Sequence, residues 1–250
     1  MDFSFLLNTW WGIIILVVIA GHFTIMCTSL YLHRSLTHLS VTFHPIIAFP
    51  MRLWLWLFTG MSAKEWVSVH RKHHAHCETE HDPHSPVIYG WAQILFLGVK
   101  YYRIAYKDKE TIEKYGKGLP NDVLERFFFE PTRFVGPVVL LVLCFFGFGW
   151  LWGSVIWAGL VLWVPFWAAG VVNGLGHTIG YRNFVVEDES RNLSPVGLLL
   201  SGEELHNNHH KFPSRAKFSV KWFEFDMGWL YISILRGLGL AKLRIPIENA

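Results

Sequence analysis

The sequence predicts an all-α integral membrane protein in which a few membrane-spanning helices carry a helical, polar cap. Its composition is 52% hydrophobic and only 16% charged, whereas a soluble domain carries about 25% charged residues. No Lys or Arg occurs from Met1 to His33, and no charged residue occurs from Phe134 to Tyr181. These runs exceed the roughly 20 apolar residues that cross a bilayer. The composition excludes an ordinary soluble enzyme, a nucleic-acid-binding protein and a disordered chain.

Three apolar stretches predict the membrane spans. They cover about residues 10–31, 134–152 and 154–172. Little more than Gly153 separates the last two, and a tight turn is expected near Gly149 to Gly153. A fourth stretch, Pro45 to Met61, is shorter and carries Arg52 near its middle. An Arg at the centre of a span costs about 2.5–3.5 kcal/mol, so we expect this stretch to form a re-entrant or interfacial helical segment.

The basic residues predict how the chain is oriented. All 22 Lys and Arg lie outside the three spans, and with the fourth stretch not crossing they share one side of the membrane. The positive-inside rule makes that side cytosolic. We therefore expect residues 1–250 to form a single multi-pass membrane domain, with a cytosolic cap at about residues 62–133 and 178–250. The first span lacks the basic start and cleavage pattern of a secretory leader.

The histidines form two triplets with the same spacing. His70, His73 and His74 repeat the i, i+3, i+4 pattern of His206, His209 and His210, which places three imidazoles on one helical face about 5–6 Å apart. Such a triplet should arise by chance roughly 0.04 times in a chain of this composition. Two triplets favour metal ligands over a solvated His-rich loop.

Other histidines are less distinctive. His33 and His38 are five residues apart, about 140° around an α-helix, so they would not share a ligand face and could serve different metals. His177 ends the last span, one turn after Asn173; it could ligate a metal or bond a carbonyl. Asn173 could hold a metal-bound water or bond a neighbouring helix. His22, inside the first span, is expected to pack or to form an interhelical hydrogen bond.

The remaining histidine motif, HDPHSP, contains His81 and His84 around Asp82 and Pro83. We expect it to form a turn, with support of a metal ligand as the alternative. The three cysteines are an odd set without paired spacing, so a disulfide framework is not expected.

The number of imidazoles predicts two metals. Zinc normally takes four ligands and octahedral ions take six, and nitrogen ligands alone do not identify the element. The zinc-peptidase pattern H-E-x-x-H is absent from the sequence. A metal transporter would place coordinating groups near the bilayer midplane, where this chain has almost none. A catalytic site at the membrane surface, acting on a lipid-soluble molecule, is therefore favoured, and two irons reacting with dioxygen could attack its C–H bonds.

Four ordered motifs then resemble the membrane fatty acyl desaturases, specifically the acyl-CoA (stearoyl-CoA type) branch and its bacterial relatives. The motifs are HRSLTH, EWVSVHRKHHAHCETEHDPHSP, NGLGH and GEELHNNHHKFPSRAKFS, and the resemblance covers about Tyr31 to Leu240. It implies a membrane helical domain under a cytosolic cap that holds a dimetal centre, with the acyl chain in a bent tunnel. The implied metal ligands are His33, His38, His70, His73, His74, His177, His206, His209 and His210. It also implies a water-mediated contact to metal from Asn173.

The resemblance further implies the reaction. Two non-haem iron ions, O2 and two electrons would remove two hydrogens from a fatty acyl chain carried by CoA, acyl carrier protein or a lipid, leaving a cis double bond. The electrons would come from an external donor, a ferredoxin, rubredoxin or small cytochrome, because the chain has no Cys cluster for an iron–sulfur centre. Membrane lipids are the other expected partners, nucleic acid is not, and a bacterial inner membrane is the expected location.

Two alternatives stay open. A related di-iron lipid hydroxylase or decarboxylase would share these motifs, and a non-catalytic metal carrier or sensor is a further possibility. The sequence also departs from the family, which usually has two spans before its first histidine motif, because only 32 residues precede His33 here. That length allows one span and leaves the acyl-chain length open.

Overall fold

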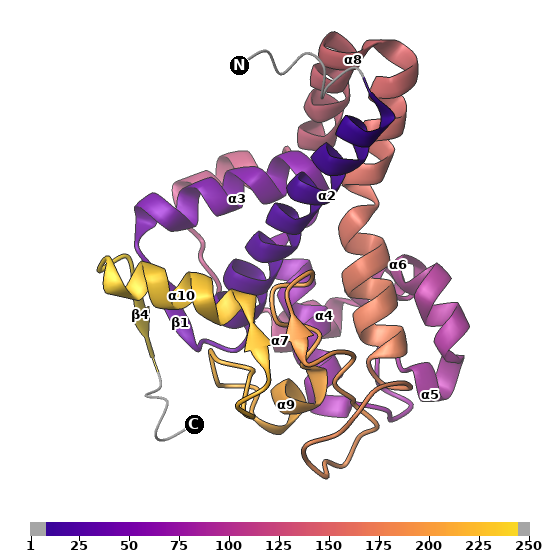
Figure 1. The fold of residues 1–250 in the computed structure, drawn as a ribbon, viewed down its shortest axis with the longest axis vertical. Helices are drawn as coiled ribbons and strands as arrows, with labels where there is room; N and C mark the ends of the chain where they lie inside the picture. The colour runs from indigo at the N-terminus through magenta and orange to yellow at the C-terminus, as the bar shows by residue number, and fades with distance from the viewer. Residues whose placement is uncertain (1–8, 245–250) are drawn as a thin grey trace.

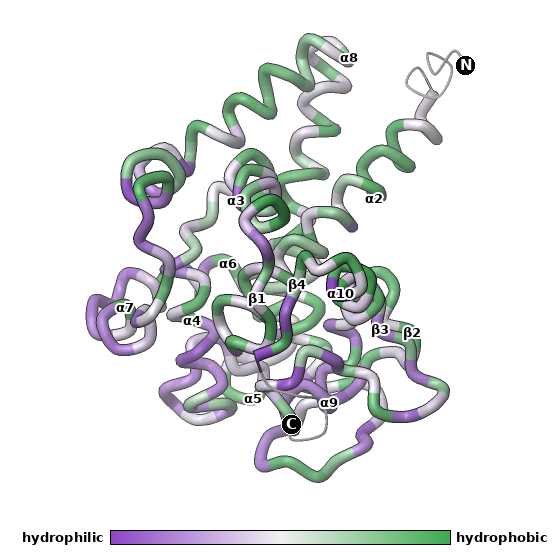
Figure 2. Tube along the Cα trace, turned by 90° about the vertical axis from the view of Figure 1, so that its left-hand side faces the viewer, coloured by the Kyte–Doolittle hydropathy of each residue, from purple (hydrophilic) through white to green (hydrophobic). Residues whose placement is uncertain are grey.

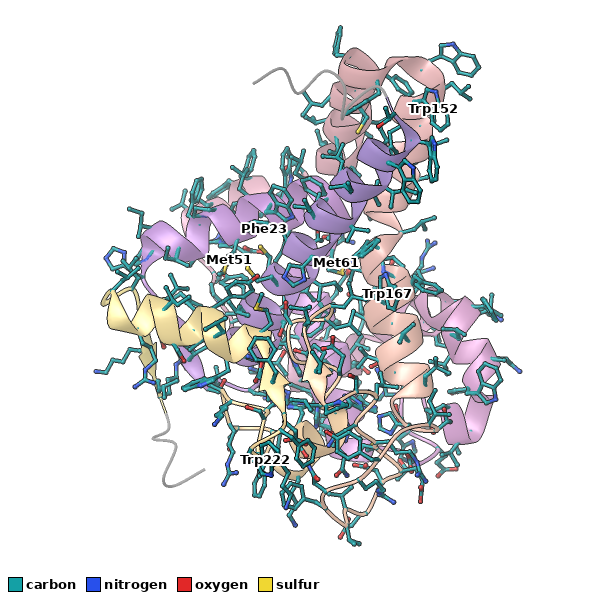
Figure 3. All side chains as sticks on the ribbon, viewed as in Figure 1. Phe23, Met51, Met61, Trp152, Trp167 and Trp222 are labelled. Atoms are coloured by element: carbon teal, nitrogen blue, oxygen red, sulfur yellow. The ribbon has the colours of Figure 1, made fainter. Side chains whose placement is uncertain are left out.

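The computed structural model describes residues 9–244, so the two ends of the predicted 1–250 domain lie outside the described residues. Two long helices, α2 (Trp10–Cys27) and α8 (Val135–Val161), project from a wider base of shorter helices and loops (Figure 1). We call these two helices the rods and the remainder the base. Hydrophobic residues follow the rods, and hydrophilic residues gather in the base (Figure 2). Trp152 lies at the far end of the rods, and Trp222 lies at the opposite end of the molecule (Figure 3). The predicted all-α membrane fold is confirmed.

Two helical stretches in the described part of the chain are long and apolar enough to cross a membrane. The first, Trp10–Thr37, joins α2 to the π-helix η1 (Thr28–Thr37); the second, Val135–Leu175, joins α8 to the π-helix η3 (Pro165–Leu175). A bent pair, α3 (Pro45–Thr59) and α4 (Ala63–His76), also passes the same test when its two helices are taken together. The chain is therefore a membrane protein with two or three candidate spanning segments.

Helix α8 is a hairpin that reverses within the turn predicted near Gly149 to Gly153. Gly149 has a left-handed φ of 72° and breaks the helix, so the first arm ends before residue 152, where the first span of the pair is predicted to end. Gly153 has another role, because a Cβ atom there would lie 2.7 Å from the carbonyl oxygen of Cys144. It lets the two arms of the hairpin approach closely. The first arm, residues 135–148, is only about 21 Å long at 1.5 Å per residue.

Helix α3 does not run along the other rods. It crosses α2 (Figure 1) and bends by 89° into α4. Gly60 ends α3 with a φ of 65°, and the Ser62 side chain caps α4 by accepting from the backbone N–H of Glu65. Arg52 is not left unpaired, because its guanidinium donates to Asp122 at 2.7 Å and to Glu125 at 2.9 Å. These pairs remove the cost that an isolated cation would carry in an apolar helix.

The base contains the shorter elements. They are α5 (Pro86–Tyr89), α6 (Trp91–Lys107), α7 (Lys109–Tyr115), η2 (Glu125–Phe129), α9 (His206–Lys211) and α10 (Met227–Gly237). Four short strands form two pairs, β1 (Val41–Phe43) antiparallel to β4 (Ala241–Leu243) and β2 (Val196–Gly197) parallel to β3 (Phe225–Asp226). Helix α6 packs tightly on η3, since a Cβ atom at Gly98 would lie 2.7 Å from the carbonyl oxygen of Ala169.

A buried ion pair ties η1 to the C-terminal region. Arg34 donates to Asp226 at 3.0 Å, and neither side chain is exposed to solvent. Asp226 also accepts from the backbone N–H of Trp229 and so caps α10. The guanidinium of Arg34 lies 3.9 Å above the ring of Phe218. The pair therefore fixes the first span against the segment that follows α9.

Substitution Asp226→Ala should destabilise the protein strongly, because it leaves the Arg34 cation buried without its partner. We expect the free energy of unfolding in detergent to fall by about 3–5 kcal/mol. The matched control is Glu189→Ala, which removes an exposed carboxylate paired with Arg191 at 3.2 Å and should cost at most about 1 kcal/mol. Equal losses in the two variants would contradict the structural role of the pair.

Candidate metal centre

Four segments deliver the predicted ligands to one place in the base. Helix α4 carries His70, His73 and His74, α9 carries the second triplet, and η1 ends at His38 after His33. His177 directly follows η3 and its C-cap residue. The triplets lie on helices, as their spacing predicts.

The structure brings all nine imidazoles together in two groups. In each group the candidate ligand atoms all lie within 4.8 Å of one another. The first group is His33, His38, His70, His74 and His209; the second is His73, His177, His206 and His210. Each helix triplet contributes to both groups, which therefore adjoin, and the rings of His74 and His210 are 4.6 Å apart. Whether these groups bind metal stays a prediction.

His33 and His38 belong to the same group, contrary to the geometry expected of an α-helix. The segment between them is π-helical, and the backbone N–H of His38 donates to the carbonyl of His33 at 3.1 Å. A π-helix closes i to i+5 hydrogen bonds and therefore places residues five apart on one side. The expectation that the pair would face different metals is wrong for this reason.

The spacing of ring nitrogens indicates the kind of coordination that the site fits. The Nε2 atoms of His33 and His209 are 3.0 Å apart, and those of His177 and His206 are 2.9 Å apart. Two nitrogens about 2.1 Å from one ion are roughly 3.0 Å apart at a right angle and roughly 3.4 Å apart at the tetrahedral angle. The observed distances fit right-angled ligands, as in an octahedral or square-pyramidal site. Additional buried nitrogens, Nε2 of His38 and of His210, lack a hydrogen-bond partner within the described residues.

In four of these rings the Nδ1 atom is hydrogen-bonded to a carboxylate. The Nδ1 atoms of His33 and His73 lie 2.8 Å and 3.0 Å from Glu203 and Asp82 respectively. Two further pairs, His177 with Glu78 and His210 with Asp188, have Nδ1–oxygen distances of 2.9 Å and 2.8 Å. A ring that donates through Nδ1 presents the lone pair of Nε2, so such a carboxylate fixes both tautomer and orientation.

Sequence reasoning missed these four acids. Glu78 and Asp82 lie inside the second motif and Glu203 lies inside the fourth, so their position beside the candidate ligands was an available signal. Asp188 lies in a loop without such a signal. Asp82 also forms the expected turn, because it accepts from the backbone N–H groups of Glu78 and His84. It therefore both shapes the loop and supports His73.

Burial keeps most of the site uncharged. It lowers the pKa of six imidazoles well below the ordinary value of 6.5, namely His38, His70, His74, His206, His209 and His210. Neutral imidazole is the form that binds metal. Burial also opposes protonation of His73, but the carboxylate of Asp82 outweighs it and raises the pKa of His73.

The other histidines are largely outside the two groups. His22 forms the expected interhelical contacts, to the carbonyl of Leu199 at 3.1 Å and to the hydroxyl of Tyr231 at 3.0 Å. His81 is exposed. His84 is buried beside His73 and Asp82, and burial lowers its pKa to about 3. All three cysteines are free, as expected, and the Sγ atom of Cys77 lies 3.8 Å from Nε2 of His73.

A cavity of about 320 Å³ reaches the site. His33, His70 and His206 form part of its wall, and Asn173 lines the same space. Much of the remaining wall is apolar and includes Ile25 and Val164. An apolar space that ends at two groups of imidazoles can hold a hydrocarbon chain beside a metal centre.

Comparisons with known proteins agree with this site. Residues 8–232 match the family model described as fatty acid desaturase. The chain is 36% identical over 183 residues to an sn-2 palmitoyl-lipid 9-desaturase of Nostoc sp. (strain 36), covering 71% of this chain and 61% of that protein. It is 31% identical to an sn-1 stearoyl-lipid 9-desaturase of Anabaena variabilis, covering 84% of this chain and 75% of the relative. It is also 31% identical to an acyl-CoA C20 Delta5-desaturase of Anemone leveillei, covering 98% and 77% respectively.

Substitution Asp82→Asn should weaken metal binding without removing a ligand. The amide cannot accept the Nδ1–H of His73 and hold the backbone of Glu78 in the same way, so we expect metal affinity to fall about 10–100-fold. Chelator competition measures this change. The control is Glu80→Gln, because the side chain of Glu80 is 85% exposed. Metal affinity should be unchanged in this control, and an unchanged affinity in Asp82→Asn would contradict the orienting role.

The stability of the metal-free protein should decrease in acid. The folded chain keeps neutral the six imidazoles whose pKa is lowered by burial. In the unfolded chain the same imidazoles take up protons below about pH 6.5. The unfolded state then binds more protons, so the free energy of unfolding falls as the pH is lowered below 6.5. The raised pKa of His73 acts in the opposite direction, but for one ring only. We therefore expect chelator-treated protein to melt at a lower temperature at pH 5 than at pH 7.5. An equal or higher melting temperature at pH 5 would contradict the predicted loss of stability.

Proposed function

Because the chain belongs to the fatty acid desaturase family, we propose that it inserts a cis double bond into a fatty acyl chain at a pair of non-haem irons. The observation that carries the proposal is the convergence of nine imidazoles, in two adjoining groups, beside a largely apolar cavity whose wall includes His33, His70 and His206. The family and the named relatives support the desaturase activity. The chain spans 61% of the Nostoc relative and about three quarters of the other two, so the substrate and the partners of the whole protein are part of the proposal.

The two groups are proposed to hold one iron each. The group around His209 offers five nitrogens and the group around His206 offers four, and the near-right-angled spacing favours a six-coordinate metal over tetrahedral zinc. Asn173 is proposed to contact the second metal through a water molecule. When bound, the iron pair with O2 and two electrons supplies an oxidant strong enough to remove hydrogen from an unactivated C–H bond.

The protein's own groups prepare this chemistry. Glu203, Asp82, Glu78 and Asp188 fix four of the rings, so little reorganisation is needed during the reaction. The apolar wall holds the acyl chain and excludes water from the reacting carbons. The oriented chain and the fixed rings together determine which carbons meet the metals.

The remaining parts of the proposal concern the surroundings. The whole chain is taken as one multi-pass membrane domain with the site on the cytosolic side, as in a bacterial inner membrane. Electrons are proposed to come from a ferredoxin, a rubredoxin or a small cytochrome. Hydrophilic residues are concentrated in the base (Figure 2), and docking of such a carrier there through complementary charge is part of the proposal.

The activity is tested by the fatty acids of a host that lacks desaturases. We expect expression with a supplied electron donor to produce new cis-monounsaturated chains, which gas chromatography with mass spectrometry detects and whose double bond it locates. Hydroxylated or shortened chains would instead select a related hydroxylase or decarboxylase. Unchanged lipids from folded, iron-loaded protein would contradict enzymatic activity and favour a metal carrier or sensor.

The ligand assignment is tested by His73→Ala and His209→Ala. Each removes one imidazole from a different group, so we expect loss of iron and a decrease of activity below detection. The matched control is His22→Ala, which removes a half-buried imidazole bonded to Leu199 and Tyr231 and should retain iron. Unchanged iron content in both group variants would overturn the assignment.

A further inference from the structure

The cavity has an outer opening whose rim is largely apolar. Besides the histidines, its wall includes Val99 and Arg103 of α6 and Phe134 at the start of α8, all of them exposed. Val99 is 41% exposed and Phe134 is 66% exposed. Helix α6 packs closely against η3 at Gly98, which also lines the cavity. The opening therefore lies between α6 and the residues that begin the α8 hairpin.

The position of Phe134 places this opening at the membrane surface. Phe134 is the N-cap residue of α8, and no charged residue follows it until Arg182. Arg133 directly precedes it and pairs with Glu65, another residue of the cavity wall, at 3.0 Å. A cation and an aromatic ring at the end of a span are typical of the lipid head-group level. The opening thus lies at the depth of the glycerol esters of a bilayer.

The outer face of α6 also suits contact with lipid. Phe96, Leu97 and Ile104 are 73%, 46% and 60% exposed, and Lys100, Arg103 and Lys107 alternate with them along the helix. This mixture of apolar and basic side chains is characteristic of a helix that lies in the membrane interface.

One polar group inside the opening has no partner in the protein. The hydroxyl of Tyr102 is buried, lines the cavity, and makes no hydrogen bond to any residue within 9–244. A buried hydroxyl without a partner costs about 1–3 kcal/mol. Its neighbour Tyr101 lies outside the cavity wall and donates to Gln93. A carbonyl oxygen of the substrate could accept a hydrogen bond from the Tyr102 hydroxyl.

On the premise of the proposed function, we propose that the substrate is an acyl chain esterified to a bilayer glycerolipid, which enters the cavity sideways between α6 and the start of α8. The hydroxyl of Tyr102 donates to the ester carbonyl and so sets the distance between the ester and the metal end of the cavity. The relatives do not decide this point, because their names include both lipid and acyl-CoA desaturases. The apolar rim and its depth favour the lipid.

The test is photocross-linking of the iron-loaded protein in phosphatidylglycerol vesicles. The probe is a phosphatidylglycerol with a diazirine near the middle of one acyl chain, and the comparison probe is the same acyl group as a CoA thioester. We expect the lipid probe to label cavity peptides containing Trp66 or Ala168, which mass spectrometry identifies. Labelling of these peptides by the CoA probe but not by the lipid probe would overturn the proposal.

Matched tryptophan variants test the route. Val99→Trp places a large ring at the opening and should reduce lipid labelling of the cavity peptides at least fivefold. Leu97→Trp adds the same ring on the same helix at a residue that does not line the cavity, and labelling should persist. Equal labelling in the two variants would contradict the proposed route.

The role of Tyr102 is tested by Tyr102→Phe against Tyr101→Phe. Loss of one hydrogen bond should reduce labelling by the ester probe roughly three- to tenfold in the first variant only. A probe with an ether in place of the ester lacks the carbonyl, so it should label wild type and Tyr102→Phe equally. A parallel loss with both probes would indicate a structural role and overturn the assignment.

Cross-linking does not depend on turnover, so the two proposals can fail separately. Labelled but inactive protein would count against desaturation and leave the lipid portal intact. Active protein whose cavity is labelled only by the CoA probe would leave desaturation intact and overturn the portal.

Discussion

The hydrogen bonds between buried carboxylates and imidazoles are the constraint on which the rest of the structure depends. Nine rings can share so small a volume as candidate ligands only if each presents a defined nitrogen. Glu203 fixes a ring of η1 from the loop before α9, and Asp82 fixes a ring of α4 from the loop that follows the same helix. The Arg34–Asp226 pair then holds η1 against the segment after α9. These contacts therefore stabilise both the site and the fold.

Much of this arrangement could be predicted from the sequence because it depends on local periodicity. The i, i+3, i+4 triplets require only an α-helix, and the apolar runs require only a membrane. The sequence could not predict that His33 and His38 share one group. Their hydrophobic pattern does not distinguish a π-helical turn from an α-helical turn. Asp188 could not be found either, because its partner His210 lies in a distant segment and only the tertiary structure brings them together.

Glycine positions show the same division between local and tertiary information. The sequence places Gly149 and Gly153 in one turn region, but their roles differ: Gly149 supplies a positive φ, whereas Gly153 supplies room for a neighbouring carbonyl. Gly98 likewise permits the contact between α6 and η3 that leaves the other edge of α6 open. The shape of the cavity thus depends on close backbone approaches that composition does not reveal.

The short first arm of α8 has a consequence for the surrounding bilayer. At about 21 Å it is roughly 9 Å shorter than a typical hydrocarbon core of about 30 Å. For the hairpin to reach the opposite head groups, nearby leaflets must be compressed, at a cost of fractions of a kcal/mol per Å of mismatch. Kinked acyl tails make a membrane thinner and softer, so the hairpin is accommodated most easily where such tails are already abundant.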